Sequence, residues 1–202
     1  MRVPFGRSFA LVALWLAVVA VPPVRAAGQQ PAPRSVTLAT DPVILTRIET
    51  LLAMPDAVLT TDFYRIDTRF GPNVALDAVV VTAVDLQRRI PGLRIGLHDD
   101  AKPVARSSSS FLDIDEAASL SRALTSMIEL AGKWTGREDQ RSTDVSFTTV
   151  GGFAIGIHEA GRVQRGFLSS GVADPVRTSI EVADFVTLKL AVDQAIAVLA
   201  EK

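Results

Sequence analysis

Two stretches of this chain repeat one pattern: residues 90–99 read IPGLRIGLHD and residues 150–159 read VGGFAIGIHE. Both follow the order apolar, any, Gly, apolar, any, Ile, Gly, apolar, His, acid. Farther along, residues 112–114 (LDI) and 180–182 (IEV) each precede a segment with helical spacing of apolar residues. Such self-similarity is typical of a duplicated structural unit. The repeat predicts two tandem copies of a unit that consists of a hairpin, a further strand and a helix.

Several segments around the repeat have the spacing of β-strands. Residues 74–84 (VALDAVVVTAV) are apolar at both alternating sets of positions, which is typical of a central strand buried on both faces. Residues 145–148, 153–158, 163–168 and 176–182 alternate apolar and polar side chains, which predicts one buried and one wet face. Gly151-Gly152 and Pro91-Gly92 are predicted turns.

Three segments are predicted helices. The first covers residues 43–52, with Asp41 as its cap and Pro42 at its first position. The second begins at Asp113, which with Glu116 three residues later has the pattern of a capping box. Asp184 caps the third. Residues 102–110, with four consecutive serines, are predicted to be an exposed loop. The fold class that follows is α+β, an antiparallel sheet with helices packed on one face.

The amino terminus has the pattern of a secretory signal peptide. Arg2 and Arg7 precede an uncharged apolar run from 8 to 21, and Val24-Arg25-Ala26 offers small or apolar residues at the positions that a signal peptidase reads. The run is shorter than the roughly 20 apolar residues that a spanning helix needs, so we expect no stable membrane span after cleavage. The predicted organisation is a signal peptide at 1–26, a flexible lead-in at 27–40, and a single domain at 41–202 in the periplasm or outside the cell.

Composition excludes several classes of function. The chain has no cysteine, which excludes disulfides, thiolate metal sites and a lipid anchor on cysteine. Without the three arginines of the signal, 18 basic residues remain against 22 acidic ones, a net charge near −4 that argues against a nucleic-acid partner. Neither a phosphate-binding glycine loop nor a zinc-protease or serine-hydrolase motif occurs in the sequence, so no cofactor is predicted.

The candidate site residues come from the repeat. His98 and His158 occupy equivalent positions on the predicted wet faces, and each is followed by an acid, Asp99 or Glu159. Two imidazoles with neighbouring carboxylates could bind a metal such as zinc, or a histidine could act as a general base. Gly96 and Gly156 lie two residues earlier and would leave room for a ligand. The simpler interpretation is that each histidine is a polar residue at the end of a strand, and that both copies of an ancestral hairpin retained it.

A second group of acids, Asp113, Asp115 and Glu116, stands at a predicted helix start, where capping explains carboxylates better than a cation does. The leading hypothesis is therefore an exported, non-catalytic binding or interaction domain, with a small apolar ligand or a partner protein. One alternative is a metal-dependent hydrolase that uses His98 and His158 with their acids. Another is a structural subunit of an envelope complex, with edge strands that pair between chains.

Overall fold

Two four-stranded antiparallel sheets and three helices make up the part of the chain that the computed structural model describes, residues 44–68, 73–99, 104–134, 142–172 and 174–202. The predicted signal peptide and lead-in lie outside these residues, as do Asp41 and Pro42. In chain order the elements are α1 (Arg47–Leu52), β1 (Leu59–Ile66), β2 (Val74–Ala83), β3 (Arg88–Asp99), β4 (Arg106–Asp113), α2 (Ile114–Trp134), β5 (Ser142–Thr148), β6 (Ala154–Ala160), β7 (Val163–Ser170), β8 (Val176–Ile180) and α3 (Asp184–Ala200).

Each sheet is a meander whose strands pair in chain order, β1-β2-β3-β4 and β5-β6-β7-β8, and each is followed by a helix. The predicted α+β class is confirmed, and the arrangement is compatible with two tandem units. Each unit holds four strands and a helix, one strand more than the hairpin, strand and helix that the sequence predicted.

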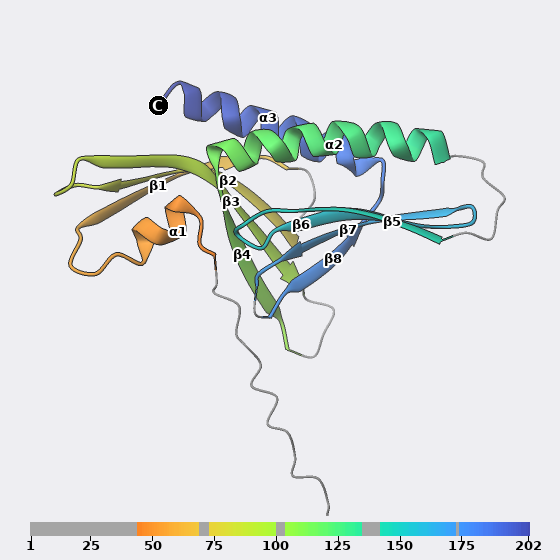
Figure 1. Ribbon diagram of the computed structural model, residues 1–202, viewed down its shortest axis with the longest axis horizontal. Coiled ribbons are helices and arrows are strands. Elements are labelled where there is room, and N and C mark those ends of the chain that lie inside the picture. The colour runs from red at the N-terminus through yellow and green to blue at the C-terminus, as the bar shows by residue number, and fades with distance from the viewer. Residues whose placement is uncertain (1–43, 69–72, 100–103, 135–141, 173) are drawn as a thin grey trace, which may run out of the picture. The chain divides into compact units, whose positions relative to one another are not determined.

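The two long helices lie side by side over the sheets (Figure 1). Helix α3, which ends the second unit, contacts β1, β2 and β3 of the first sheet, and α2, which ends the first unit, contacts β5 and β6 of the second sheet as well as β3 and β4. The end of α3 places Lys202 Nζ 5.2 Å from the ring centroid of Tyr64 in β1. Each helix therefore covers part of the other unit's sheet. None of the helices within the described residues is long and apolar enough to cross a membrane.

One hydrophobic core runs through both units. It joins buried side chains of the first sheet, such as Leu76 and Ile95, to Leu124 of α2, Ile155 of β6 and Val192 of α3. Burial of each such side chain contributes about 1.5–3 kcal/mol. Since these side chains pack in a single cluster, the two units share one core.

The central strand β2 is buried on both faces, as its apolar run predicts. One face contributes to the shared core, and the other packs Val79 and Val81 against Ile48 and Leu51 of α1 in a second, smaller cluster. Helix α1 therefore covers part of the outer face of the first sheet, on the side away from α3.

The predicted turn at Pro91-Gly92 is wrong, because both residues lie inside β3 and pair with Val80 and Val79 of β2. A Cβ on Gly92 would stand 2.2 Å from the carbonyl oxygen of Leu112, so close approach of the neighbouring strand, and not a turn, requires this glycine. A turn at Gly151-Gly152 is confirmed between β5 and β6, but it is one residue longer than the predicted two-residue turn, because Thr149 pairs with Phe153 and the loop comprises residues 150–152.

The exposed loop predicted at residues 102–110 is wrong from Arg106 onward, because the serines belong to β4. Ser110 is fully buried, and its hydroxyl lies 2.9 Å from the hydroxyl of Ser170 in β7, where the two sheets meet. Gly171 N also donates to Ser110 Oγ over 3.2 Å. A hydroxyl that is hydrogen-bonded in this way can face a core without the cost of an unpaired polar group.

Two helix starts differ from the predictions. Helix α1 begins at Arg47 and has Thr46 as its cap, with a complete capping box between Thr46 and Glu49. Helix α3 has Ala183 at the cap position, which makes no side-chain bond, and Asp184 instead accepts a hydrogen bond from Glu181 N over 3.2 Å.

Candidate functional site

The structure places the two histidines in different sheets. His98 lies on β3, the third strand of the first sheet, opposite Ser107; His158 lies on β6, the second strand of the second sheet, opposite Asp144 and Arg165. The ten-residue match that motivated the site thus aligns a third strand with a second strand. The two histidines do not occupy equivalent positions in the two four-stranded units.

The acids that follow the histidines in sequence point away from them. Successive side chains of a strand lie on opposite faces. Glu159 accordingly lies on the inner face and is 1% exposed, whereas His158 is exposed on the outer face. Asp99 likewise alternates with His98, and both are half-buried.

The carboxylate that reaches His158 is one that the sequence analysis missed. Asp144 on β5 lies directly across from His158, and its Oδ1 is 2.6 Å from His158 Nδ1. A two-residue turn at Gly151-Gly152 would pair residue 144 with 159. The actual loop is centred on Gly151, since Thr149 pairs with Phe153, and this shifts the partner of Asp144 by one residue to His158. With its proton on Nδ1, the imidazole donates to Asp144 and directs Nε2 away from that carboxylate.

The glycines before the histidines do not hold open space for a ligand. A Cβ on Gly156 would stand 2.6 Å from ring atoms of Phe167, so the Phe167 ring fills the room above this glycine. A Cβ on Gly96 would meet Ser109 Oγ at 3.4 Å and Ala75 Cβ at 3.6 Å, which is contact with neighbouring strands.

Around His158 the outer face of the second sheet forms a hollow of about 400 Å³, called here the His158 hollow. It is lined by Asp144, Ser146, His158, Phe167 and Arg177. The guanidinium carbon of Arg177 stands 3.9 Å from the centroid of the Phe167 ring, and Phe167 in turn rests on Gly156. The hollow therefore combines a stacked cation, an imidazole with a carboxylate partner, and a hydroxyl.

The charges at the His158 hollow are only partly compensated. Asp144 pairs with His158, while Arg177 and the neighbouring Arg165 form no ion pair within the described ranges. The first sheet differs, because there the buried Asp77 pairs with both Arg65 and Arg94, and Arg94 stacks on Phe63 at 4.3 Å. Two arginines without a carboxylate partner favour an anionic ligand at the second sheet.

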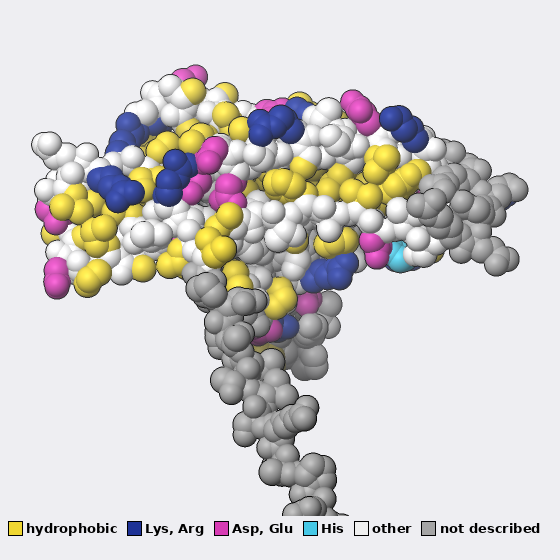
Figure 2. Space-filling model, viewed as in Figure 1, with side chains coloured by type: hydrophobic (Ala, Val, Ile, Leu, Met, Phe, Trp, Pro, Cys, Tyr) yellow, Lys and Arg dark blue, Asp and Glu magenta, His cyan; other side chains and the backbone are white. Residues whose placement is uncertain are grey.

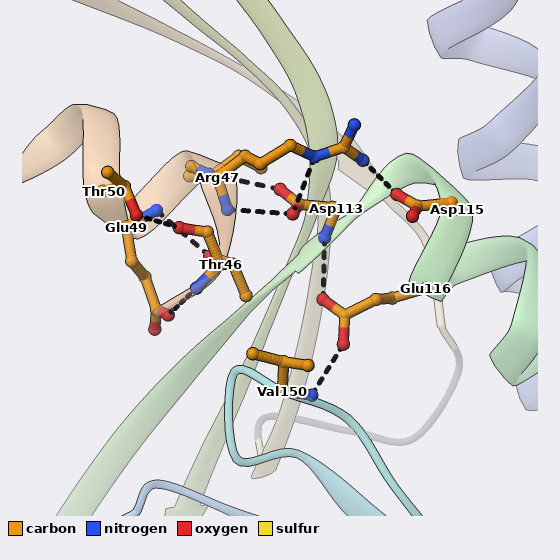
Figure 3. A network of polar contacts seen from close by, with 9 residues as sticks. Thr46, Arg47, Glu49, Thr50, Asp113, Asp115, Glu116 and Val150 are labelled. Carbon is orange, nitrogen blue, oxygen red and sulfur yellow. Dashed lines mark hydrogen bonds and ion pairs between the residues drawn. The ribbon is translucent and has the colours of Figure 1, made fainter. Parts of the chain in front are cut away.

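The second group of acids has structural roles (Figure 3). Asp113 Oδ2 accepts hydrogen bonds from Arg47 N at 2.8 Å and Arg47 Nε at 3.0 Å, and Oδ1 accepts one from Ile48 N at 3.2 Å. Asp113 therefore caps α1 and not, as predicted, the helix that follows it. Its hydrogen bond and its charge, with that of Asp115, raise the pKa of Arg47 above the ordinary arginine value.

Glu116 connects this corner to the second unit. Its Oε2 accepts a hydrogen bond from Asp113 N over 3.2 Å, which is one half of the predicted capping box, and its Oε1 accepts one from Val150 N over 2.6 Å. Within the described residues, no group of three or more His, Asp or Glu side chains has the geometry to hold a metal ion.

Comparison with known proteins gives no relative, since no family model, curated protein or solved structure matches this chain.

Proposed function

We propose that this protein is an exported, non-catalytic binding domain, and that the His158 hollow binds a small, planar, anionic ligand. The observation that carries the proposal is the stack of Arg177 on Phe167 beside the pair of His158 and Asp144. The signal-peptide pattern of residues 1–26 supports export.

The chemistry of the lining defines the ligand class. A guanidinium that lies flat on one aromatic ring can stack a second planar group on its other face while its edge donates to an anion. The imidazole adds a donor or an acceptor at Nε2. The polar lining favours such a ligand over the apolar ligand that the composition suggested.

The exposure of the histidine pair favours binding over catalysis. The side chains of His158 and Asp144 are 48% and 73% exposed, so solvent screens their interaction. A general base in an enzyme usually lies in a site from which water is largely excluded, whereas this pair is open to solvent.

The proposal can be tested by NMR titration of the purified protein with benzoate, and with cyclohexanecarboxylate as a probe of equal charge without a planar ring. We expect benzoate to shift the amides around His158 with a dissociation constant in the millimolar range, about 4 kcal/mol of binding free energy. Cyclohexanecarboxylate should bind several-fold more weakly, because it cannot stack on the guanidinium.

Variants separate charge from stacking. Arg177→Ala should weaken benzoate binding about tenfold, and Arg177→Lys, which keeps the charge but loses the planar group, about two- to fivefold. Arg89→Lys, at an exposed arginine on β3, is the matched control and should change nothing. Equal affinity for the two carboxylates, or full binding by Arg177→Ala, would refute the ligand class. Ester hydrolysis that His158→Ala abolishes would refute the non-catalytic role.

A further inference from the structure

Strand β5 forms an edge of the second sheet, and one side of its backbone has no strand partner among the described residues (Figure 1). Thr149 N donates to Phe153 O over 2.8 Å at the closed end of the β5–β6 hairpin. Because alternate residues of a strand direct their backbone groups to the same side, Thr143, Val145 and Phe147 bond to β6. The peptide groups of the other four residues, Ser142, Asp144, Ser146 and Thr148, face the open edge.

Apart from the single charge of Asp144, this edge lacks the features that usually prevent pairing between chains. Residues 142–148 (STDVSFT) contain no proline, lysine or glycine, and the register with β6 is continuous, without a bulge. Three of the seven residues, Thr143, Val145 and Phe147, are half-buried, and the last two pack against the shared core. Figure 2 shows apolar side chains gathered between α2 and the strands below it. A further strand beside β5 would continue that packing.

We propose that a second copy of this chain pairs with β5 in antiparallel register about Val145, which joins the second sheets of the two copies into one sheet of eight strands. A two-fold axis at Val145 places Asp144 opposite the partner's Ser146 and Thr143 opposite the partner's Phe147. The single charge of the strand then faces a hydroxyl and never its own copy, and every outward-facing peptide group of one strand meets one of the other. A second copy can therefore pair along the whole strand without placing like charges opposite each other, which supports it as the occupant of this edge.

The pairing would also join two His158 hollows. Asp144 and Ser146 both line the hollow, and both lie on the outer face of β5 at the proposed contact. Each copy would therefore close one wall of its partner's hollow. This arrangement does not depend on the ligand proposed above, because backbone pairing can form with the hollow empty.

The test uses three substitutions at one position. Ser146→Asp places a carboxylate opposite the partner's Asp144 at two symmetric points, which should raise the dimer dissociation constant about 2- to 30-fold. Ser146→Lys places a cation there and should lower it. Ser146→Pro removes a donor that faces the edge and leaves the bonds to β6 intact, and should give a monomer.

The mass in solution is measured by analytical ultracentrifugation over protein concentrations from about 1 μM to 1 mM, which spans binding free energies of about 8 to 4 kcal/mol. Amide hydrogen exchange adds a site-specific measurement, since the amides of Asp144 and Ser146 should become protected as the dimer forms. A wild-type monomer at every concentration would overturn the proposal. So would a dimer whose dissociation constant is the same in the Asp and Lys variants, a comparison that stands even if the proline variant fails to fold.

Discussion

Asp113 offers the sharpest test of how this fold is held together, because one carboxylate caps α1 from the end of β4. Its side chain is 9% exposed and accepts from two backbone N–H groups, those of Arg47 and Ile48. Loss of a cap costs about 0.5–2 kcal/mol, and a buried donor left unpaired costs about 1–3 kcal/mol. The ion pair with Arg47 adds little, because that side chain is 54% exposed. We expect Asp113→Ala to lose about 2–4 kcal/mol.

The assay is urea unfolding followed by circular dichroism, with thermal unfolding as a second measurement. In a domain of this size 1 kcal/mol corresponds to about 2–4 °C, so Asp113→Ala should lower the Tm by about 5–15 °C. Asp115→Ala is the matched control, since the Asp115 side chain is 73% exposed and, among the described residues, its carboxylate pairs with the Arg47 side chain; its effect should stay within about 0.5 kcal/mol. The reasoning is refuted if Asp113→Ala loses less than about 1 kcal/mol or no more than the control.

Two further predictions concern close packing and pH. Gly151→Ala should destabilise the protein by about 1–3 kcal/mol in urea unfolding, because its Cβ would stand 1.9 Å from the carbonyl oxygen of Phe111. Gly132→Ala, with open space in α2, should stabilise it by about 0.5–1 kcal/mol, and the opposite order would contradict the packing. Burial raises the pKa of Asp193. Hydrogen bonds from Lys189 and Ser121, together with the positive charge of Lys189, outweigh burial and lower this pKa overall. A lowered pKa stabilises the fold above the unfolded value of about 3.9 and loses that contribution as pH falls through the folded pKa. Asp193→Asn should therefore be less stable by up to about 1 kcal/mol at pH 7, with a difference that shrinks in acid; a constant difference from pH 7 to pH 2 would exclude this role.

The sequence predicted the structure well where the spacing of apolar residues along a strand reflects which faces of that strand are buried. The run at 74–84 shows both buried faces of β2, because apolar residues at both alternating positions fit no other place in a sheet. It did not show that Asp77 within the run is stabilised by Arg65 and Arg94 from the two flanking strands, since that needs the register of three strands. Polarity also concealed β4, whose serine at 110 is buried and hydrogen-bonded to Ser170 where the two sheets meet.

The sequence predicted the position of His158 in the candidate site, but not the side chains that surround it. Strand alternation placed His158 on the outer face, as the structure shows, and the wrong carboxylate was assigned because sequence neighbours were preferred to cross-strand neighbours. Neither Phe167 nor Arg177, which contact each other in the structure, belongs to a recognisable sequence motif. A stack between adjacent strands depends on how β7 pairs with β8, and a loop sets that register.

The packing of each long helix against the other unit's sheet explains why the outer face of the second sheet is the better place for a ligand. Helices α2 and α3 occupy the inner faces of both sheets, so only outer faces can be open. On the first sheet α1 covers part of that face, and the two arginines beside Asp77 both form ion pairs with its carboxylate. On the second sheet none of the described helices takes the corresponding position, and Arg165 and Arg177 keep their charge without an ion pair among the described residues. The first sheet thus has a partly covered outer face whose arginines are ion-paired, whereas the second has an outer face that no described helix covers and whose arginines have no such partner among the described residues. This difference makes the second sheet the better place for an anionic ligand.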